Sequence, residues 1–142
     1  MTTDRLPPPY FENNAGQLLE DPAGFLRINW STRARTLPEL QDFCEHMLLA
    51  MQRNRWARAL GNQRDMTPFT PAEQQWVTQS WLPRMVREGG YRFGALLVSP
   101  NVMVRLATAY VTTNVQGLPL VYRSFETEAE ALQWLQQQPG RP

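Results

Sequence analysis

The side chains best suited to nucleophilic or acid–base chemistry are a single cysteine, Cys44, and a single histidine, His46. They lie two positions apart in a segment with helical periodicity, so they point about 200° away from each other. Cys44 falls among apolar positions and is expected to be buried, whereas His46 falls on the polar side. One cysteine and one histidine also cannot supply the ligands of a usual zinc site. We therefore predict no catalytic residues, no metal and no cofactor.

All 14 basic residues are arginine, which excludes Schiff-base chemistry and a P-loop lysine. Four of them surround Trp56 with no acid between them: Arg53, Arg55, Arg58 and Arg64. This cluster could bind an anion, but cations of this kind are also typical of a helix C-terminus followed by solvated side chains. The formal charge of +1 argues against nucleic acid as a partner.

Residues 62–70 join a predicted strand to a predicted helix and carry the strongest binding-site pattern. In open α/β sheets, ligands bind at the carboxyl ends of strands, where helix N-termini offer free N–H groups. The same edge should also carry Ser99-Pro100-Asn101 and the segment from Ser124 to Thr127. The candidate ligand- or partner-binding residues are Arg64, Asp65, Thr67, Thr70, Ser99 and Asn101. In the alternative interpretation, Thr70 is only a helix cap and Asp65 only a turn residue.

Four helices must position these residues, and the patterns place them at 37–53, 71–88, 100–112 and 128–137. Three helices begin with Thr-x-x-Glu, the capping-box pattern, at Thr36, Thr70 and Thr127. Pro83 lies inside the second helix and is expected to kink it. Trp76, in the same helix, is one position off the inward stripe and is a candidate interface residue. The third helix carries Val102, Leu106, Ala109 and Tyr110 on one side.

Strands fit the remaining segments. Residues 17–20 and 25–30 flank a turn sequence and predict a hairpin, to which residues 10–13 add an edge strand. Residues 93–98 are continuously apolar, as expected of a strand covered on both faces. Residues 118–124 predict a further strand, and residues 57–63 are assigned as a strand because it completes the alternation of strand and helix. The sum is a mixed sheet: a hairpin or meander followed by alternating strands and helices.

The chain is expected to form one domain over residues 10–137, with a disordered proline-rich lead-in (1–9) and a flexible tail (138–142). A single cysteine allows no intramolecular disulfide. The N-terminus lacks the apolar region of a signal peptide, and no apolar run reaches the roughly 20 residues that span a bilayer. A cytoplasmic location without a membrane span is the resulting expectation.

Three stretches together resemble bacterial STAS-type domains of the SpoIIAA-like group, over residues 10–137. They are Asn62-Gln63-Arg64-Asp65 before Phe69-Thr70-Pro71-Ala72-Glu73, then Trp76 through Pro83 with residues 91–98, and finally residues 125–135. The resemblance implies an α/β fold with a mixed sheet, an N-terminal antiparallel hairpin or meander, and four helices. It also implies kinship to anti-sigma-factor antagonists and, more distantly, to CRAL-TRIO lipid carriers.

Antagonists of this kind are phosphorylated on a serine at a helix start, and Asp65-Met66-Thr67 occupies the comparable place. The sequence departs from that pattern, because Pro68 follows the threonine and the Ser-Gly pair is missing. Phosphorylation of Thr67 is the corresponding hypothesis.

The leading interpretation is a non-enzymatic STAS-like regulatory or binding module that recognises a protein partner. The alternative is a carrier of a small or lipid-like ligand, or a small enzyme, with its site at the strand ends. A third interpretation is a structural homodimer formed through the hairpin edge or the Trp76 face. The first two differ in whether a cavity exists at the carboxyl ends of the strands.

Overall fold

Six strands form one sheet in which the spatial order of the strands equals their order in the sequence. The computed structural model describes residues 6–115 and 117–141. The first three strands are antiparallel, and the third to the sixth run parallel. The sheet is thus mixed, as predicted, and the strands are β1 (Phe11–Asn13), β2 (Gly16–Asp21), β3 (Phe25–Trp30), β4 (Arg58–Asn62), β5 (Phe93–Leu97) and β6 (Val121–Phe125).

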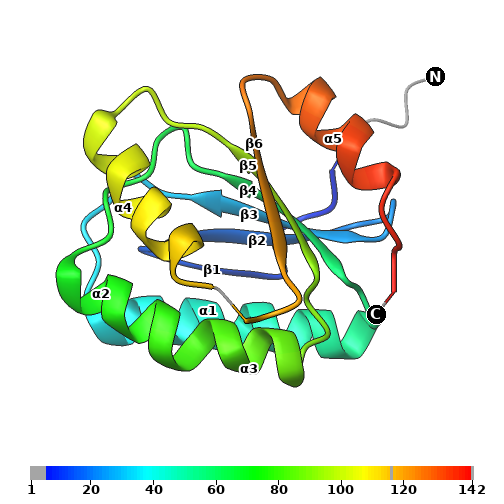
Figure 1. The fold of residues 1–142 in the computed structure, drawn as a ribbon, viewed down its shortest axis with the longest axis horizontal. Helices are drawn as coiled ribbons and strands as arrows, with labels where there is room; N and C mark the ends of the chain where they lie inside the picture. Colours follow the sequence, from blue (N-terminus) through cyan, green and yellow to red (C-terminus); the bar gives the residue numbers. More distant parts are fainter. Residues whose placement is uncertain (1–5, 116, 142) are drawn as a thin grey trace.

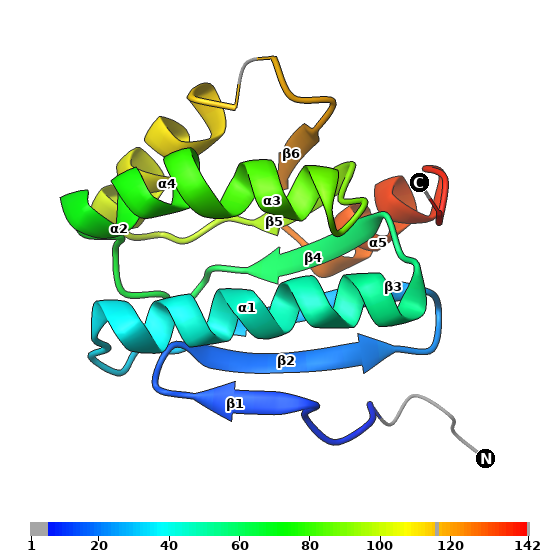
Figure 2. The ribbon, with the colours of Figure 1, turned by 90° about the horizontal axis from the view of Figure 1, so that it is seen from below.

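The helices cover the two faces of the sheet unequally (Figures 1 and 2). They are α1 (Leu37–Asn54), α2 (Pro71–Trp76), a π-helical segment η1 (Val77–Trp81), α3 (Leu82–Arg87), α4 (Val102–Thr113) and α5 (Glu128–Gln136). Right-handed crossovers between adjacent parallel strands put α1, α2–α3 and α4 on one face. The last helix, α5, packs on the other face against β4, β5 and β6.

Local capping chemistry sets where the helices start. The hydroxyls of Thr36 and Thr70 each accept from the backbone N–H of a glutamate three residues later. The backbone N–H of each threonine in turn donates to the side chain of that glutamate. Thr127 caps α5 through the N–H of Glu130. All three predicted starts are confirmed, with helix bounds within two residues of the prediction.

Pro83 is accommodated by a change of helix type. A proline inside an α-helix has no N–H to donate and clashes with the carbonyl four residues back. Here the preceding turn is π-helical, and the Leu82 N–H donates to the Val77 carbonyl, five residues back. The chain therefore continues from α2 into α3 in one line (Figure 2).

The sheet has a core on each face. The larger one lies between the sheet and α1 to α4, and the smaller one lies under α5. β5 contributes to both, because Ala95 and Leu97 face α5 while Leu96 faces the other helices. Its continuously apolar sequence is the consequence of this two-sided burial, as predicted.

The sequence pattern placed Val102, Leu106, Ala109 and Tyr110 on one side of α4. The helix buries a different side. Its buried residues are Val104, Ala107 and Val111. Val102, Met103, Leu106 and Tyr110 are exposed. Because α4 is apolar on both sides, its periodicity alone does not identify the core side.

The ends of the domain differ in their contacts. Residues 6–9 have no regular structure, and residues 1–5 and 142 lie outside the described part. The segment expected as a flexible tail contacts β4: the Gly140 carbonyl accepts from the Ala57 N–H at 3.0 Å, and Arg58 donates to the Gln138 carbonyl at 3.3 Å. In the described ranges no helix is both long and apolar enough to cross a bilayer.

Candidate functional site

Small residues leave space on the side of β4 and β5 that faces α1 to α4. Ala59 pairs with Gly94 and Gly61 with Leu96, so these four positions share one face of β4 and β5. The rings of Tyr91 and Tyr122 fill the space over Gly94. A Cβ atom at Gly94 would lie 2.2 Å from the Tyr91 hydroxyl and 2.5 Å from the ring of Tyr122. The missing side chains therefore make room for aromatic rings between the sheet and α4.

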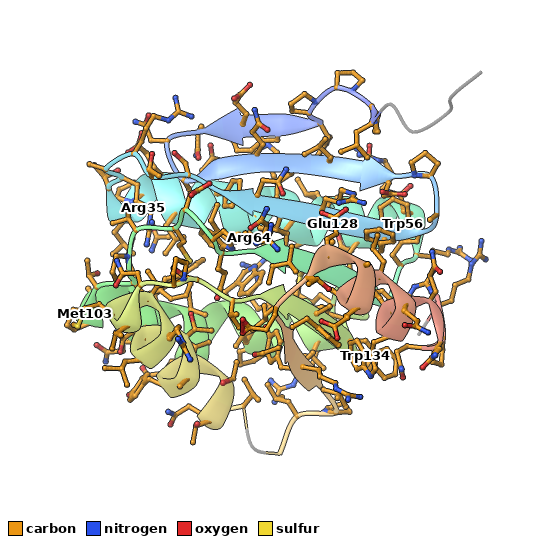
Figure 3. All side chains as sticks on the ribbon, turned by 90° about the horizontal axis from the view of Figure 1, so that it is seen from above. Arg35, Trp56, Arg64, Met103, Glu128 and Trp134 are labelled. Carbon is orange, nitrogen blue, oxygen red and sulfur yellow. The ribbon has the colours of Figure 1, made fainter. Side chains whose placement is uncertain are left out.

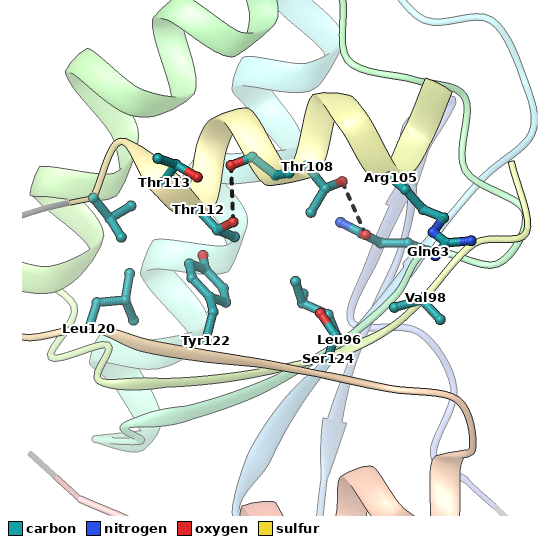
Figure 4. Close-up of a pocket in the computed structure, with 12 residues that line it drawn as sticks. Gln63, Leu96, Val98, Arg105, Thr108, Thr112, Thr113, Leu120, Tyr122 and Ser124 are labelled. Atoms are coloured by element: carbon teal, nitrogen blue, oxygen red, sulfur yellow. Dashed lines mark hydrogen bonds between the residues drawn. The ribbon is translucent and has the colours of Figure 1, made fainter. Parts of the chain in front are cut away.

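A cleft of about 510 Å³ lies between α4 and strands β5 and β6 (Figure 4). We call it the α4 cleft. The helix supplies Arg105, Thr108 and Thr112, and the strands supply Leu96, Tyr122 and Ser124, among other lining residues. Its volume falls within the range of about 300–1,000 Å³ that is typical of small-molecule sites.

The α4 cleft continues inward as a narrow apolar end. This inner part holds about 50 Å³ and is lined by Phe69, Trp81, Tyr91 and other core side chains. Gln63, Thr108 and Tyr122 belong to both parts. The cleft therefore has a polar mouth and an apolar end, which suits a ligand with one polar and one apolar part.

Gln63 is the most informative residue of the cleft, because it is only 6% exposed. Its backbone N–H donates to the Leu97 carbonyl at 3.1 Å, which holds it just beyond the end of β4. Its amide oxygen accepts from the Thr108 hydroxyl at 3.2 Å, and its NH₂ group points into the cleft (Figure 4). Within residues 6–115 and 117–141 this NH₂ group has no protein hydrogen-bond acceptor. The amide nitrogen is open to solvent at the cleft, because the buried side-chain polar atoms without a partner in the described residues are Arg35 Nη1 and Arg58 Nε. Water or a ligand can therefore accept from this NH₂ group.

The two tyrosines keep their protons at neutral pH. Burial raises the pKa of Tyr91 well above its usual range, and the nearby Tyr122 raises it further. Burial also raises the pKa of Tyr122 to about 12, although the hydrogen bond with Tyr91 lowers it in part. Both phenols are thus neutral hydrogen-bonding groups rather than bases.

The lining of the α4 cleft carries positive charge and no negative charge. It includes Arg105, and no aspartate or glutamate is among its described lining residues. Arg105 forms no ion pair with any described residue. Together with the Gln63 amide and the Tyr122 hydroxyl, it gives the cleft a surplus of donors. Such a lining favours a ligand rich in acceptors, above all a carboxylate.

Three of the predicted site residues lie together at the strand ends. Arg64, Asp65 and Ser99 line a depression of about 610 Å³, which shares Val98 and Arg105 with the α4 cleft. Arg64 donates to the Glu126 carbonyl at 3.0 Å (Figure 3 shows Arg64 at this edge). The depression is therefore continuous with the mouth of the cleft.

The other predicted residues have structural roles. The Thr67 hydroxyl donates to the Thr32 carbonyl at 2.9 Å, and Thr70 caps α2. Asn101 caps α4 by accepting from the Met103 N–H at 2.8 Å. Trp76 is half-buried against the core rather than fully exposed. None of these four lines the cleft or the depression.

A comparison with known protein families, curated proteins and solved structures finds no match to this chain. The chemistry of the α4 cleft is therefore the basis for a functional assignment. Gln63 lies in the segment 62–70 that carried the binding-site pattern but was not among the named candidates, and Arg105, Thr108 and Tyr122 escaped prediction from the sequence. The available signal was the run of small residues in β4 and β5, which leaves space on the sheet.

The arginine cluster predicted around Trp56 does not form a shared site. Arg53 pairs with Glu20, and Arg64 lies at the strand ends. Arg58 is buried and donates to main-chain carbonyls, including those of Leu135 and Ala23. Arg53 lies in α1 and Arg64 follows β4, so the length of the strand separates these two side chains.

Cys44 and His46 are held apart. Cys44 is buried, as predicted, and burial raises the pKa of its thiol well above the usual range. His46 is less solvated than predicted, because its ring stacks on Phe11 at a centroid distance of 3.7 Å. Its Nδ1 also lies 2.8 Å from the Asp42 carbonyl oxygen.

Proposed function

We propose that this chain is a non-enzymatic binding module that holds a small amphipathic ligand, with a carboxylate or similar acceptor group, in the α4 cleft. The observation that carries the proposal is Gln63, a residue only 6% exposed whose one solvent-open NH₂ group faces a cleft of about 510 Å³. Without a ligand, water in the cleft can accept from this donor. A ligand acceptor would replace that water and add a charge-assisted hydrogen bond if it is a carboxylate.

The cleft also suggests how the ligand would lie. Its acceptor group would meet Gln63 and the Arg105 guanidinium at the mouth, where a charge-assisted hydrogen bond can form. Its apolar part would pack against Leu96 and Tyr122 and point toward the inner end near Trp81. A binding role fits better than catalysis, because Tyr122, whose pKa is about 12, is no general base at neutral pH.

We also propose that the module is STAS-like, of the SpoIIAA-like group. An antiparallel meander followed by alternating parallel strands and helices supports this assignment, since it is the element order that the resemblance implies. A ligand in the cleft accords with the carrier interpretation of that resemblance.

Blocking the α4 cleft should abolish ligand retention. Ala109 lines the cleft from an exposed position on α4, so Ala109→Trp places a large ring in the opening with little cost to folding. We expect native mass spectrometry of the protein purified gently from its source to show excess mass that leaves on denaturation. We expect Ala109→Trp to show the bare mass.

The matched control is Ala129→Trp, at an exposed position on α5, on the other face of the sheet. It should retain the excess mass. A bare wild-type mass, or equal retention by Ala109→Trp and the wild type, would contradict the proposal.

A second candidate, recognition of a protein partner, is favoured by the outer side of α4. Val102, Met103 and Leu106 are each about three-fifths exposed, with Tyr110 half exposed beside them (Met103 is labelled in Figure 3). Four large apolar side chains at helical spacing form a patch of the kind that marks interaction sites.

Charge on this outer side should prevent such an interaction without unfolding the domain. Leu106→Glu changes a side chain that is 61% exposed, and Leu49→Glu on α1, 46% exposed, is the control. A protein that copurifies with the wild type and the control should be lost from Leu106→Glu. Loss from both variants, or from neither, would count against this candidate.

A further inference from the structure

Four arginines surround one hollow of about 500 Å³ at the end of the sheet opposite the strand carboxyl ends. They come from four separate segments: Arg55 caps the C-terminal end of α1, Arg87 is the last residue of α3, Arg92 precedes β5, and Arg141 lies in the C-terminal segment. We call this the arginine hollow. It shares no lining residue with the α4 cleft.

The positive charge of the hollow is not balanced locally. Arg55, Arg87 and Arg141 form no ion pair with any described residue. Glu88 is the one carboxylate in the described lining, and Arg84 already pairs with it at 3.4 Å. The whole chain carries a formal charge of only +1, so general basicity does not explain the gathering. Like charges brought together repel, and an anion bound between them would remove that repulsion.

Backbone features distinguish two of the arginines. Arg92 donates from Nη1 to the carbonyls of Val86 and Tyr91, both at 2.9 Å, which orients its guanidinium. Arg55 has φ +55 and ψ +44, the left-handed conformation usually given to glycine at a helix end. A long charged side chain at this disfavoured position points to a use for the charge.

The tail brings the fourth arginine to the hollow. The Gly140 carbonyl accepts from the Ala57 N–H at 3.0 Å, just before β4. Arg58 also donates to the Gln138 carbonyl, so the segment is held on both sides of Pro139. Arg141 therefore lines the hollow as part of a docked segment.

We propose that the arginine hollow binds an anion with several phosphoryl groups, either a free polyphosphorylated molecule or a lipid headgroup. Guanidinium groups match phosphate oxygens bidentately, and four of them around one hollow exceed the needs of a single phosphate. This second site is independent of the ligand proposed for the α4 cleft.

The test is isothermal titration calorimetry of the full chain with inorganic tripolyphosphate at low salt. Arg87→Glu should raise Kd by about tenfold or more, since a hydrogen bond to a charged group is lost and a repulsion added. The control is Arg33→Glu, which changes the net charge by the same amount. Arg33 precedes the N-terminal end of α1 and lies outside the hollow. It should change Kd by less than about threefold.

Arg55→Gly separates binding from folding. Glycine adopts φ +55 without strain, so this variant should melt at a higher temperature than the wild type while its affinity for tripolyphosphate falls. Lower affinity together with a lower melting temperature would overturn the assignment of Arg55 to the site.

Vesicles identify the source of the phosphoryl groups. Phosphatidylcholine vesicles with a polyphosphorylated phosphatidylinositol should retain the protein if the ligand is a headgroup, and tripolyphosphate should then release it. Binding of tripolyphosphate without vesicle retention assigns a free ligand. No binding in either arm, or equal loss of affinity in Arg87→Glu and Arg33→Glu, would overturn the proposal.

Discussion

Replacing Glu73 with glutamine is expected to lower the free energy of unfolding by about 3–5 kcal/mol, because it leaves a buried charge without its partner. Arg35 and Glu73 form a two-point ion pair, with Nε–Oε2 and Nη2–Oε1 distances of 2.8 and 2.9 Å. Their side chains are 3% and 4% exposed. The rings of Trp30 and Phe69 lie beside the guanidinium, so water cannot easily replace the lost carboxylate.

A second ion pair supplies the control. Arg84 and Glu45 also bond at two points, but their side chains are 40% and 44% exposed. Glu45→Gln should therefore cost about 0–1 kcal/mol. Urea denaturation of the two variants measures the difference. Equal decreases in the free energy of unfolding would show that burial does not determine how much the Arg35–Glu73 pair contributes to stability.

A double replacement tests the same explanation for the Arg35–Glu73 pair. Removing both charges, as Arg35→Met with Glu73→Leu, should cost less than Glu73→Gln alone, because no buried charge remains. Part of the loss persists, since Glu73 also accepts from the Thr70 N–H in the capping box. A double variant less stable than Glu73→Gln would contradict this explanation.

Gly94→Ala is expected to lower the free energy of unfolding by about 1–3 kcal/mol through overpacking. The new Cβ would lie 2.2 Å from the Tyr91 hydroxyl and 2.5 and 2.6 Å from two ring carbons of Tyr122. Tyr91 is only 3% exposed, so its ring has little room to retreat. Because Tyr122 lines the α4 cleft, the same change should also weaken ligand retention.

Gly61→Ala is the matched control on the neighbouring strand. Its Cβ would meet the end of the Leu96 side chain at 3.2 Å, a contact that a small rotation relieves. We expect a change within about 1 kcal/mol by urea denaturation. Adding Tyr91→Phe to Gly94→Ala should recover part of the lost stability, because it removes the nearest clashing atom. If the double variant were no more stable than Gly94→Ala, the Tyr91 hydroxyl would not be the source of the strain.

The elements of the fold were predictable because their signals are local. A threonine three residues before a glutamate satisfies free helix N–H groups within one turn, so Thr36, Thr70 and Thr127 mark helix starts without any tertiary contact. Alternation and continuous apolar runs likewise identified most of the strands, whereas residues 57–63 were assigned as a strand only because it completes the order of strands and helices. The same reasoning indicated the edge where Arg64, Asp65 and Ser99 now lie together.

Tertiary packing decided which side of a helix is buried and how the chain accommodates Pro83. Helix α4 is apolar on two sides, and only its contact with the sheet selects Val104 and Ala107 over Leu106. Pro83 predicts a local disturbance, but whether it becomes a kink or a π-helical turn depends on the packing of α2 and α3.

The candidate sites follow the same division. The sequence by itself determined the strand and helix pattern and the types of the polar residues, through interactions that span a few positions. The α4 cleft joins Gln63, Arg105 and Tyr122, and the arginine hollow joins Arg55, Arg87 and Arg141. These residues are far apart along the chain, so no local pattern relates them. Their meeting depends on strand order, on glycines that leave space, and on which helix face is buried, and only the tertiary structure decided these.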